Sequence, residues 1–418
     1  MDNVRMGVVG LGRRGYALLE TVLECEEASV TAVCDVYADR RDAACKYVKD
    51  KRGKSPTAYE DYKELIKDSE VDAVLITSSW EYHVRIAVDC MKHGKIVALE
   101  VGGAYDLEDC WQLVRTYEET GTPFMMLENC CFDRFELLSE SLARAGKFGE
   151  IVNCHGAYAH DLRDQILGGH VNRHYRLENY RLRNCENYPT HELGPIAKIL
   201  NVNRGNQFLS LVSVASKSAG LEEFARSAKN PDPSLIGTKF RQGDIVDTII
   251  TCTGGETITL RLDTTLPRYY SREFTLHGTK GMCNQEANMI FLEESLDSHE
   301  FSEPEKTVAK YLNNAEQYSD YLPAEWRNIS DEERELGHGG MDYLMFKAFF
   351  KAVINGKEMP VDVYDAASWM CVTALSAASI SAGGTVQFFP DFTRGKWVTR
   401  KPYPVFDLPG YKITINRI

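Results

Sequence analysis

The sequence predicts a two-domain α/β protein, the first domain with a parallel sheet and the second with a large, open, predominantly antiparallel sheet. Two observations lead to this prediction. From Arg5 to about Phe124, short apolar runs alternate with helix-length amphipathic stretches, which is typical of βαβ units. From about Ile151, longer β-rich runs follow one another without helices between them, which is typical of an antiparallel sheet with one open face.

The strands predicted in the first domain are the apolar runs MGVVG, SVTAVCD, AVLIT, KIVALE and PFMML. Helices are predicted between them, over residues 15–23, 38–49, 59–67, 83–93 and 107–118. The predicted strands of the second domain include FLSLVSVAS, IVDTIITCTG, ETITLRLDTT and REFTLHGTKG. Residues 296–335 are polar and predict a loop, and helices are predicted over 341–353 and 362–378. We therefore expect domains at residues 1–129 and 130–418.

Composition restricts the possible partners and the compartment. The 418 residues include 48 Lys+Arg and 61 Asp+Glu, for a formal net charge of −13, which disfavours nucleic acid and anionic membranes as partners. We see no signal peptide, and no stretch approaches the roughly 20 apolar residues of a membrane span. The twelve cysteines lack the paired spacings of a zinc site, so we expect a reducing, cytoplasmic environment. The open sheet face predicts a homo-oligomer.

A glycine motif follows the first predicted strand and begins the first helix. Gly10, Gly12 and Gly15 have the spacing that permits a tight turn, a close approach to a pyrophosphate and close helix–strand packing. Asp35 stands twenty residues after Gly15, at the end of the second strand, where a carboxylate accepts hydrogen bonds from ribose hydroxyls and repels a 2′-phosphate. The first domain is thus predicted to be a Rossmann domain that binds NAD. The neighbouring Arg40 and Arg41 keep NADP open as an alternative.

Several short motifs together resemble one enzyme family. They are TSSWEYH, LEN, GAYAHDLR, NYPTHELGP, YSREFTLHGTKG, GHGGMD, DVYDAASW and PDFTRGKW. With these motifs the chain resembles the NAD-dependent α-N-acetylgalactosaminidases, a glycosidase family within the glucose-fructose oxidoreductase and inositol dehydrogenase superfamily. The resemblance extends over essentially the whole chain.

The resemblance implies a hydrolase that is redox-neutral overall. NAD+ takes hydride from C3 of the sugar, a base removes the acidified proton from C2, the aglycone is eliminated, water adds, and C3 is reduced again. The substrate implied is an α-N-acetylgalactosaminide or a related hexoside. The net negative charge suits a neutral glycoside better than a sulfated or phosphorylated one.

The resemblance also implies the site residues. The catalytic candidates are Tyr158, Tyr188, His191, Glu128 and Tyr270. His191 with Tyr188 would deprotonate the hydroxyl that is oxidised, and Pro189 is predicted to start a helix that presents both. Tyr158 is the candidate for the C2 base, although His191 remains an alternative, and Glu128 and Tyr270 would orient the sugar. The expected cofactor-binding residues are Gly10, Gly12, Arg13, Arg14, Gly15, Asp35, Trp80, His83 and Glu100.

Two positions depart from the family pattern. The dehydrogenases typically carry Glu-Lys-Pro after the strand KIVALE, and the glycosidases usually carry Glu-Val-Pro, whereas this chain has Glu100-Val101-Gly102. No lysine is therefore available there for proton transfer. Glu192 stands where the family commonly has glycine.

Some side chains also have structural interpretations. His83 could cap a helix or pack in the core instead of contacting the cofactor, and the GHGGMD segment is either a structural turn or a place where His338 and Asp342 lie near substrate. His170 and His174 would share a helical face, but convincing further ligands are lacking, so we expect no catalytic metal. Two other functions remain open: an ordinary NAD-dependent sugar or cyclitol dehydrogenase, and a non-catalytic protein that binds sugar or NAD.

Overall fold

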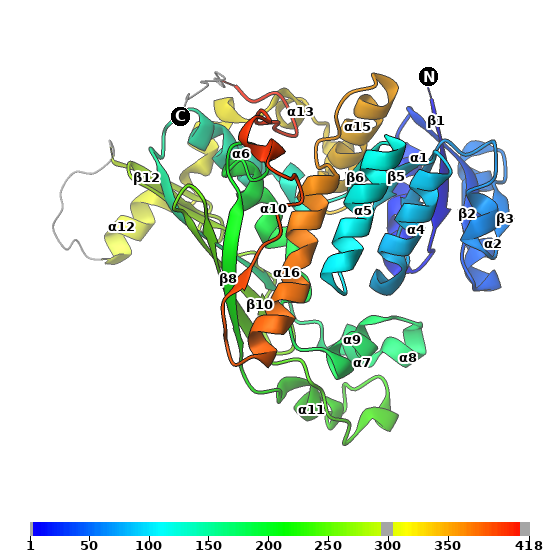
Figure 1. The fold of residues 1–418 in the computed structure, drawn as a ribbon, viewed down its shortest axis with the longest axis horizontal. Helices are drawn as coiled ribbons and strands as arrows, with labels where there is room; N and C mark the ends of the chain where they lie inside the picture. The colour runs from blue at the N-terminus through cyan, green and yellow to red at the C-terminus, as the bar shows by residue number, and fades with distance from the viewer. Residues whose placement is uncertain (1–2, 294–303, 410–418) are drawn as a thin grey trace. The chain divides into compact units, whose positions relative to one another are not determined.

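The computed structural model describes residues 3–293 and 304–409, and the chain divides into two compact units (Figure 1). The first unit comprises Met1–Phe132 and Ile329–Cys371, and the second comprises Asp133–Asn328 and Val372–Ile418. The boundary expected after residue 129 thus lies close to Phe132. The segment Ile329–Cys371 belongs to the first unit, whereas the expected ranges place it in the second domain.

A six-stranded parallel sheet forms the core of the first unit. Its strand order is β3-β2-β1-β4-β5-β6, as in a Rossmann fold. The strands are β1 (Val4–Val9), β2 (Ala28–Cys34), β3 (Thr57–Tyr59), β4 (Ala73–Ile76), β5 (Ile96–Leu99) and β6 (Phe124–Met126). Every residue of β4 and β6 is buried, because a parallel sheet is covered by helices on both faces and its strands are therefore apolar throughout. The predicted α/β fold class is confirmed.

The helices of this sheet lie close to their predicted positions. They are α1 (Arg13–Glu24), α2 (Ala38–Arg52), α3 (Tyr62–Leu65), α4 (Trp80–Lys92) and α5 (Leu107–Thr120). The helix predicted over residues 59–67 is shorter, because Thr57–Tyr59 pairs with β2 at the edge of the sheet and Asp61 caps α3 by accepting the Lys63 N–H. β3 was not predicted, since three exposed or half-buried residues carry no apolar run.

The segment Ile329–Cys371 joins the rest of the first unit through backbone hydrogen bonds and an ion pair with the buried Asp342. The Met126 N–H of β6 donates to the Val361 carbonyl at 3.1 Å, so the chain at Val361 pairs with the last strand. Helix α15 (Met341–Ile354) follows the glycine-rich turn, and its buried Asp342 accepts two hydrogen bonds from Arg14 of α1, at 2.6 and 2.9 Å. Helix α16 (Val363–Ser381) begins in this unit and ends in the second.

The second unit is built on an eight-stranded mixed sheet of order β13-β12-β11-β7-β10-β9-β8-β14. Within the described part of this sheet only β7 and β10 pair in parallel, and the other neighbouring strands are antiparallel, as predicted. The strands are β7 (Ile151–Ala159), β8 (Phe208–Ala215), β9 (Ile245–Cys252), β10 (Thr257–Asp263), β11 (Thr275–Gly278), β12 (Gly281–Asn284), β13 (Met289–Leu292) and β14 (Gln387–Phe388).

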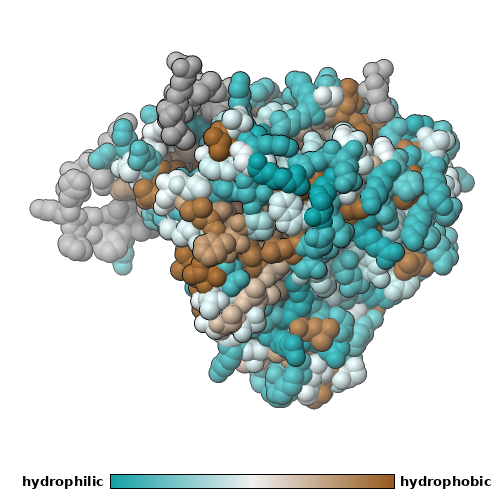
Figure 2. Space-filling view, viewed as in Figure 1, coloured by the Kyte–Doolittle hydropathy of each residue, from teal (hydrophilic) through white to brown (hydrophobic). Residues whose placement is uncertain are grey.

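One face of this sheet is packed and the other is half-exposed. Every second residue of β10 is buried, which is the alternation of a sheet with one covered face. Helices α6 (Arg134–Arg144) and α10 (Thr190–Ile199) belong to the covering layer, and α10 packs on β7. Exposed large hydrophobic side chains around β8 and β14 are Leu209, Val214, Val386 and Phe388. Figure 2 shows hydrophobic side chains gathered at the surface over the region of β8.

The remaining parts of the second unit are short helices. Around the site these are α7 (Arg163–Leu167), α8 (Gly169–Asn172), α9 (Arg176–Leu182) and α11 (Gly220–Ala225). The loop predicted over residues 296–335 contains α12 (Pro304–Tyr311) and α13 (Ala324–Arg327) of the second unit and α14 (Asp331–Arg334) of the first, while 294–303 lie outside the described residues. These helices were missed because each has at most eight residues, too few to show a helical period.

Two further sequence-based expectations concern cysteines and membrane spans. All twelve cysteines lie in the described part of the chain as free thiols, and all but the half-buried Cys45 are buried. Within the described residues, no helix combines the length and the hydropathy that a membrane crossing requires.

The Asp342 carboxylate makes the stability of the first unit depend on pH. Burial alone would raise the pKa of Asp342, but the charge and hydrogen bonds of Arg14 and the contact with His338 outweigh burial and hold that pKa well below its ordinary value. A depressed carboxyl pKa stabilises the folded state above the unfolded pKa of about 4, and this stabilisation is lost as the pH falls towards the folded pKa.

Asp342→Asn is therefore expected to lower the free energy of unfolding at pH 7 by about 3 kcal/mol, because it removes one of the two buried carboxylates that face Arg14. Urea unfolding followed by tryptophan fluorescence measures the loss. The deficit should shrink as the pH falls below about 4, because the unfolded wild-type chain then takes up a proton at Asp342 that the folded chain resists. Asp42→Asn, at an exposed position of α2, is the matched control and should leave stability within about 0.5 kcal/mol of wild type. Equal stability of Asp342→Asn and wild type at pH 7 would contradict this account.

Candidate functional site

The glycine motif of the first unit has the geometry of a phosphate-binding turn. Gly10 has φ +96°, and a Cβ on it would lie 2.6 Å from the Ser78 backbone nitrogen. A Cβ on Gly15 would lie 2.0 Å from the Gly10 carbonyl oxygen, so α1 packs directly on the turn. A Cβ on Gly12, the N-cap residue of α1, would have only the Arg40 guanidinium within 4 Å among the described residues, at 3.7 Å. Space therefore remains at Gly12 for a pyrophosphate at the helix N-terminus.

The Asp35 carboxylate lies next to this turn. It accepts the Leu11 N–H at 2.7 Å and the Tyr37 N–H at 3.0 Å, and these bonds fix it at the end of β2. Arg40 lies 3.6 Å from the same carboxylate and over the Tyr37 ring, while Arg41 donates to the Asp35 carbonyl. Both arginines are thus engaged with Asp35 or Tyr37. The residues at the end of β2 fit the ribose of NAD.

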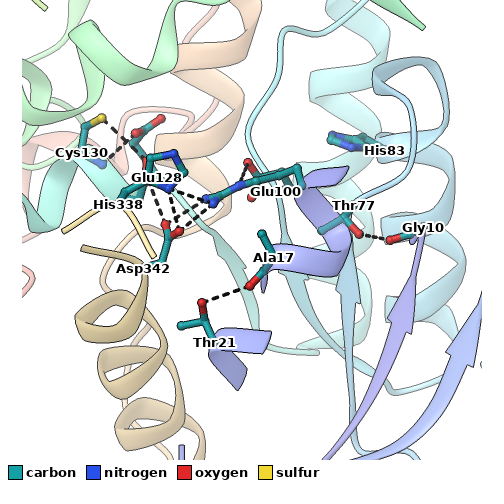
Figure 3. A network of polar contacts seen from close by, with 12 residues as sticks. Gly10, Ala17, Thr21, Thr77, His83, Glu100, Glu128, Cys130, His338 and Asp342 are labelled. Carbon is teal, nitrogen blue, oxygen red and sulfur yellow. Dashed lines mark hydrogen bonds and ion pairs between the residues drawn. The ribbon is translucent and has the colours of Figure 1, made fainter. Parts of the chain in front are cut away.

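Arg14 is the centre of a polar network in the first unit. Figure 3 labels its partners Glu100, His338 and Asp342. Besides Asp342, its guanidinium donates to Glu100 at 3.2 Å and contacts His338 Nδ1 at 3.1 Å. Asn129 donates to the same Asp342 at 2.9 Å. Asp342 is therefore a buried structural residue of this network, whereas the His338 side chain is about half exposed. Of the two arginines in the glycine motif, Arg14 faces carboxylates and Arg13, at the first position of α1, is exposed.

The departure at Gly102 has a steric reason. A Cβ on Gly102 would lie 2.5 Å from Cδ1 of Trp80, the first residue of α4. The indole occupies the space that the ring of a proline would need. Trp80 and Glu100 thus lie at the ends of β4 and β5, at the carboxyl edge of the sheet, where α/β folds bind their ligands.

Two other candidate residues of the first unit have local partners. His83 is buried, its Nε2 lies 2.9 Å from the Ser78 carbonyl, and burial lowers its pKa to about 4. A neutral histidine in this position fits the core interpretation better than direct cofactor contact. Glu128 follows β6 and accepts the Cys130 N–H at 3.0 Å, so it also holds the 3₁₀ turn Asn129–Phe132.

In the second unit, three of the predicted catalytic residues come together. Tyr158 lies near the end of β7, Tyr188 lies before α10, and His191 is in the first turn of α10, which begins at Thr190 directly after Pro189. The ring centroids of Tyr158 and Tyr188 are 4.5 Å apart, and His191 lies 5.6 Å from Tyr158 and 4.8 Å from Tyr188. Both tyrosines are buried, which places two phenols and an imidazole in a largely water-excluded cluster.

Sequence reasoning missed the cation beside this cluster. The buried Arg176 of α9 places its guanidinium 5.0 Å from the centroid of Tyr188. Burial opposes the charge on Arg176, but the neighbouring phenols, first among them Tyr158, keep its pKa above the ordinary value. By reciprocity, the positive charge favours ionisation of those phenols. The sequence contains one indication of this arrangement, because Arg176 stands in the segment HYRLENY, which is rich in aromatic residues. It was missed because a charged residue in a polar segment is usually exposed to solvent.

Tyr270 continues the cluster through a residue that was not predicted. The ring of His160 lies 6.2 Å from Tyr158 and 5.3 Å from Tyr270, so it connects the two tyrosines. The Tyr270 hydroxyl accepts a hydrogen bond from Arg272 at 3.2 Å. Arg272 is itself held by Glu136 of α6, at 2.8 Å.

The shared helical face expected for His170 and His174 is absent, because α8 ends at Asn172 and Arg173 turns the chain with φ 54°. His170 contacts Asp232 instead, and His174 accepts the Arg176 N–H. The sequence interpretation assumed a helix that continued over both histidines.

Comparisons with known proteins place the chain in a family. The model described as "Glycosyl hydrolase 109, C-terminal domain" matches residues 132–399, and that of the "Oxidoreductase family, NAD-binding Rossmann fold" matches residues 4–128. An α-N-acetylgalactosaminidase of Tannerella forsythia is 34% identical over 422 residues, covering 96% of this chain and 88% of that protein. A glycosyl hydrolase family 109 protein of Parabacteroides distasonis is 34% identical over 423 residues, covering 96% and 89%.

Solved structures share the fold at low identity. A levoglucosan dehydrogenase in complex with NADH and levoglucosan has a TM-score of 0.68 at 17% identity, covering 93% of this chain and 100% of that one. An NAD-binding oxidoreductase from Klebsiella pneumoniae has a TM-score of 0.67 at 14% identity, covering 93% and 99%. Since the relatives and the two family models agree over nearly the whole chain, this protein belongs to glycosyl hydrolase family 109, as a glycosidase with an N-terminal NAD-binding Rossmann domain.

Proposed function

We propose that this protein hydrolyses an α-N-acetylgalactosaminide or a related hexoside through transient oxidation of the sugar at C3. The observation that supports this most is the buried cluster of Tyr158, Tyr188 and His191 beside Arg176. It offers groups that can take a proton from a hydroxyl and from a carbon acid at neutral pH. The name of the Tannerella forsythia relative supports the choice of sugar.

The residues at the carboxyl edge of the first sheet fit NAD. Gly10, Gly12 and Gly15 leave the turn open to a pyrophosphate, and Asp35 is placed for the ribose. NAD, when bound, supplies a reversible acceptor for the hydrogen at C3. Arg14 supports the turn from the protein side, through Glu100 and Asp342, and Arg13 is the exposed arginine of the motif.

The second unit would carry out the proton transfers. His191 and Tyr188 accept the proton of the 3-hydroxyl as C3 becomes a ketone, and this ketone acidifies the C2–H bond. Tyr158, ionised with the help of Arg176, removes the C2 proton, and the bond from C1 to the aglycone breaks. Water then adds to the double bond and C3 is reduced again. Glu128 and Tyr270 orient the sugar. These groups need no metal ion.

The function is tested with an aryl α-N-acetylgalactosaminide and added NAD+. We expect release of the aryl alcohol with no net NADH, and deuterium at C2 of the released sugar in heavy water, because the C2 proton exchanges before water adds. Product release is followed by absorbance and deuterium by mass spectrometry. If the protein instead releases stoichiometric NADH from free sugar and leaves the glycoside intact, it is a dehydrogenase. If it binds NAD but turns over neither substrate, it is a binding protein.

Tyr158→Phe removes the phenol oxygen but keeps the ring that packs on Tyr188. We expect kcat to fall by roughly 10³-fold and deuterium incorporation at C2 to fall in parallel, since the base is lost. The bound NAD+ should still be reduced in a single turnover. Tyr321→Phe is the control and should keep the wild-type rate. If Tyr158→Phe retains C2 exchange, the base is another residue, and His191 is then the candidate.

Arg176→Gln removes the positive charge beside the phenols. Because a cation lowers the pKa of a neighbouring phenol, its loss raises that pKa, and the acidic limb of the kcat/KM profile should move to higher pH by about 1 to 2 units. Arg181→Gln, which removes an exposed arginine from the same helix, should leave the profile in place. Thermal unfolding of both variants separates loss of folding from loss of charge. An unshifted acidic limb in folded Arg176→Gln would contradict the assignment of an ionised tyrosine.

A further inference from the structure

The second unit contains a buried carboxyl group that the proposed proton transfers do not use. Glu186 stands two residues before Tyr188, in the loop that leads from α9 to α10, and it is fully buried. Among the described residues, its Oε2 has no hydrogen-bond partner and no cation acts on it. A buried carboxylate without a counter-charge is strongly destabilising, so the protonation state of Glu186 matters for the whole loop.

Hydrogen bonds place Glu186 between α16 and Tyr188. Its N–H donates to the Ser376 hydroxyl of α16 at 2.9 Å, and its Oε1 accepts the Tyr188 N–H at 3.4 Å. Gln242 holds the preceding residue, because its amide nitrogen donates to the Cys185 carbonyl at 3.0 Å. The side chain of Glu186 thus contacts the backbone of Tyr188 directly, and the position of that backbone determines where the phenol lies.

The surroundings favour the neutral form of this acid. Burial is the largest influence and raises the pKa of Glu186 to about 8, the hydrogen bond from Tyr188 opposes burial, and the negative charge of Asp247 on β9 raises the pKa further. Arg261 of β10 is already in an ion pair with Asp247. The length of the Tyr188 bond fits the neutral form, because a charged carboxylate accepts N–H groups at shorter distances. The other titratable or charged side chains of the loop and of the helices that flank it include Arg176, Arg183, Cys185, His191 and Glu192.

We propose that Glu186 is a positioning residue for Tyr188 and that it acts as the neutral, protonated acid. The inference rests on the proposed function, because it concerns how Tyr188 is held for proton transfer. The neutral acid accepts the Tyr188 N–H without placing a charge in the interior. Once the proton leaves, the carboxylate needs water or a counter-charge, and the loop that carries Tyr188 has to move to provide either. Glu186 thereby sets an upper pH limit for the aromatic cluster.

The pH profile of Glu186→Gln tests this role. The amide keeps the acceptor oxygen and cannot ionise, so kcat near pH 7 should stay within about twofold of wild type. The fall of kcat that wild type shows above a pH of about 8 should move to higher pH by about 1 unit or more. Glu150→Gln, at an exposed position of the same unit, is the matched control and should keep the wild-type profile. Glu186→Ala removes the acceptor and, where thermal unfolding shows it to be folded, should lower kcat about tenfold with little change in KM.

Two further measurements need no turnover. The infrared band of a protonated carboxylic acid should appear at pH 7 in the difference spectrum of wild type and Glu186→Gln, and it should vanish as the pH rises through about 8. In protein with carbon-labelled tyrosine rings, the Tyr188 resonance is assigned by its absence in Tyr188→Phe. It should shift over the same pH range in wild type and not in Glu186→Gln.

An alkaline limb that stays in place in Glu186→Gln, or the absence of the infrared band, would overturn the proposal. A band that titrates while the Tyr188 resonance does not move also overturns it, since the acid is then protonated without positioning Tyr188. Failure of the proposed function looks different. Wild type would then hydrolyse no glycoside, while the infrared band and the Tyr188 resonance would still respond to pH.

Discussion

The ion pair between Arg14 and Asp342 is the interaction on which the first unit depends. Arg14 belongs to the glycine turn, and Asp342 lies more than three hundred residues later, in helix α15, which also packs on α1 and β1. The same guanidinium reaches Glu100 at the end of β5. One guanidinium thus joins three segments around the glycine turn, the part of the first unit that we propose binds the dinucleotide.

A buried arginine organises the other unit in a different way. Arg176 lies over a tyrosine ring, next to a second phenol, and its role is electrostatic as much as structural. A cation held among phenols favours their ionised form over the neutral one, and the ionised form is the one that accepts a proton. Arg176 therefore both packs in the aromatic cluster and influences the acidity of its phenols, and a substitution at Arg176 acts on both.

The sequence predicted the features that local pattern encodes. The apolar runs predicted the parallel sheet, the glycine spacing predicted the phosphate turn, and Pro189 predicted the start of α10 within one residue. Features that depend on distant partners were missed. The pairing of Met126 with Val361 and the ion pair of Asp342 with Arg14 have no local signature, so nothing in the sequence indicated that residues 329–371 pack with the first compact unit. Arg176 was missed because its burial depends on tertiary packing alone.

The close approach of Trp80 to Gly102 has a consequence for comparing this chain with its relatives. A ring at position 102 and an indole at position 80 require the same volume, so a larger residue at position 102 needs a smaller one at position 80. The residue types at positions 80 and 102 therefore depend on each other and should be compared together when this chain is aligned with its relatives. A graft of the common Glu-Val-Pro sequence into this chain needs a smaller residue at position 80, and a proline placed at 102 opposite the intact Trp80 would distort the chain between β5 and α5 rather than report on catalysis.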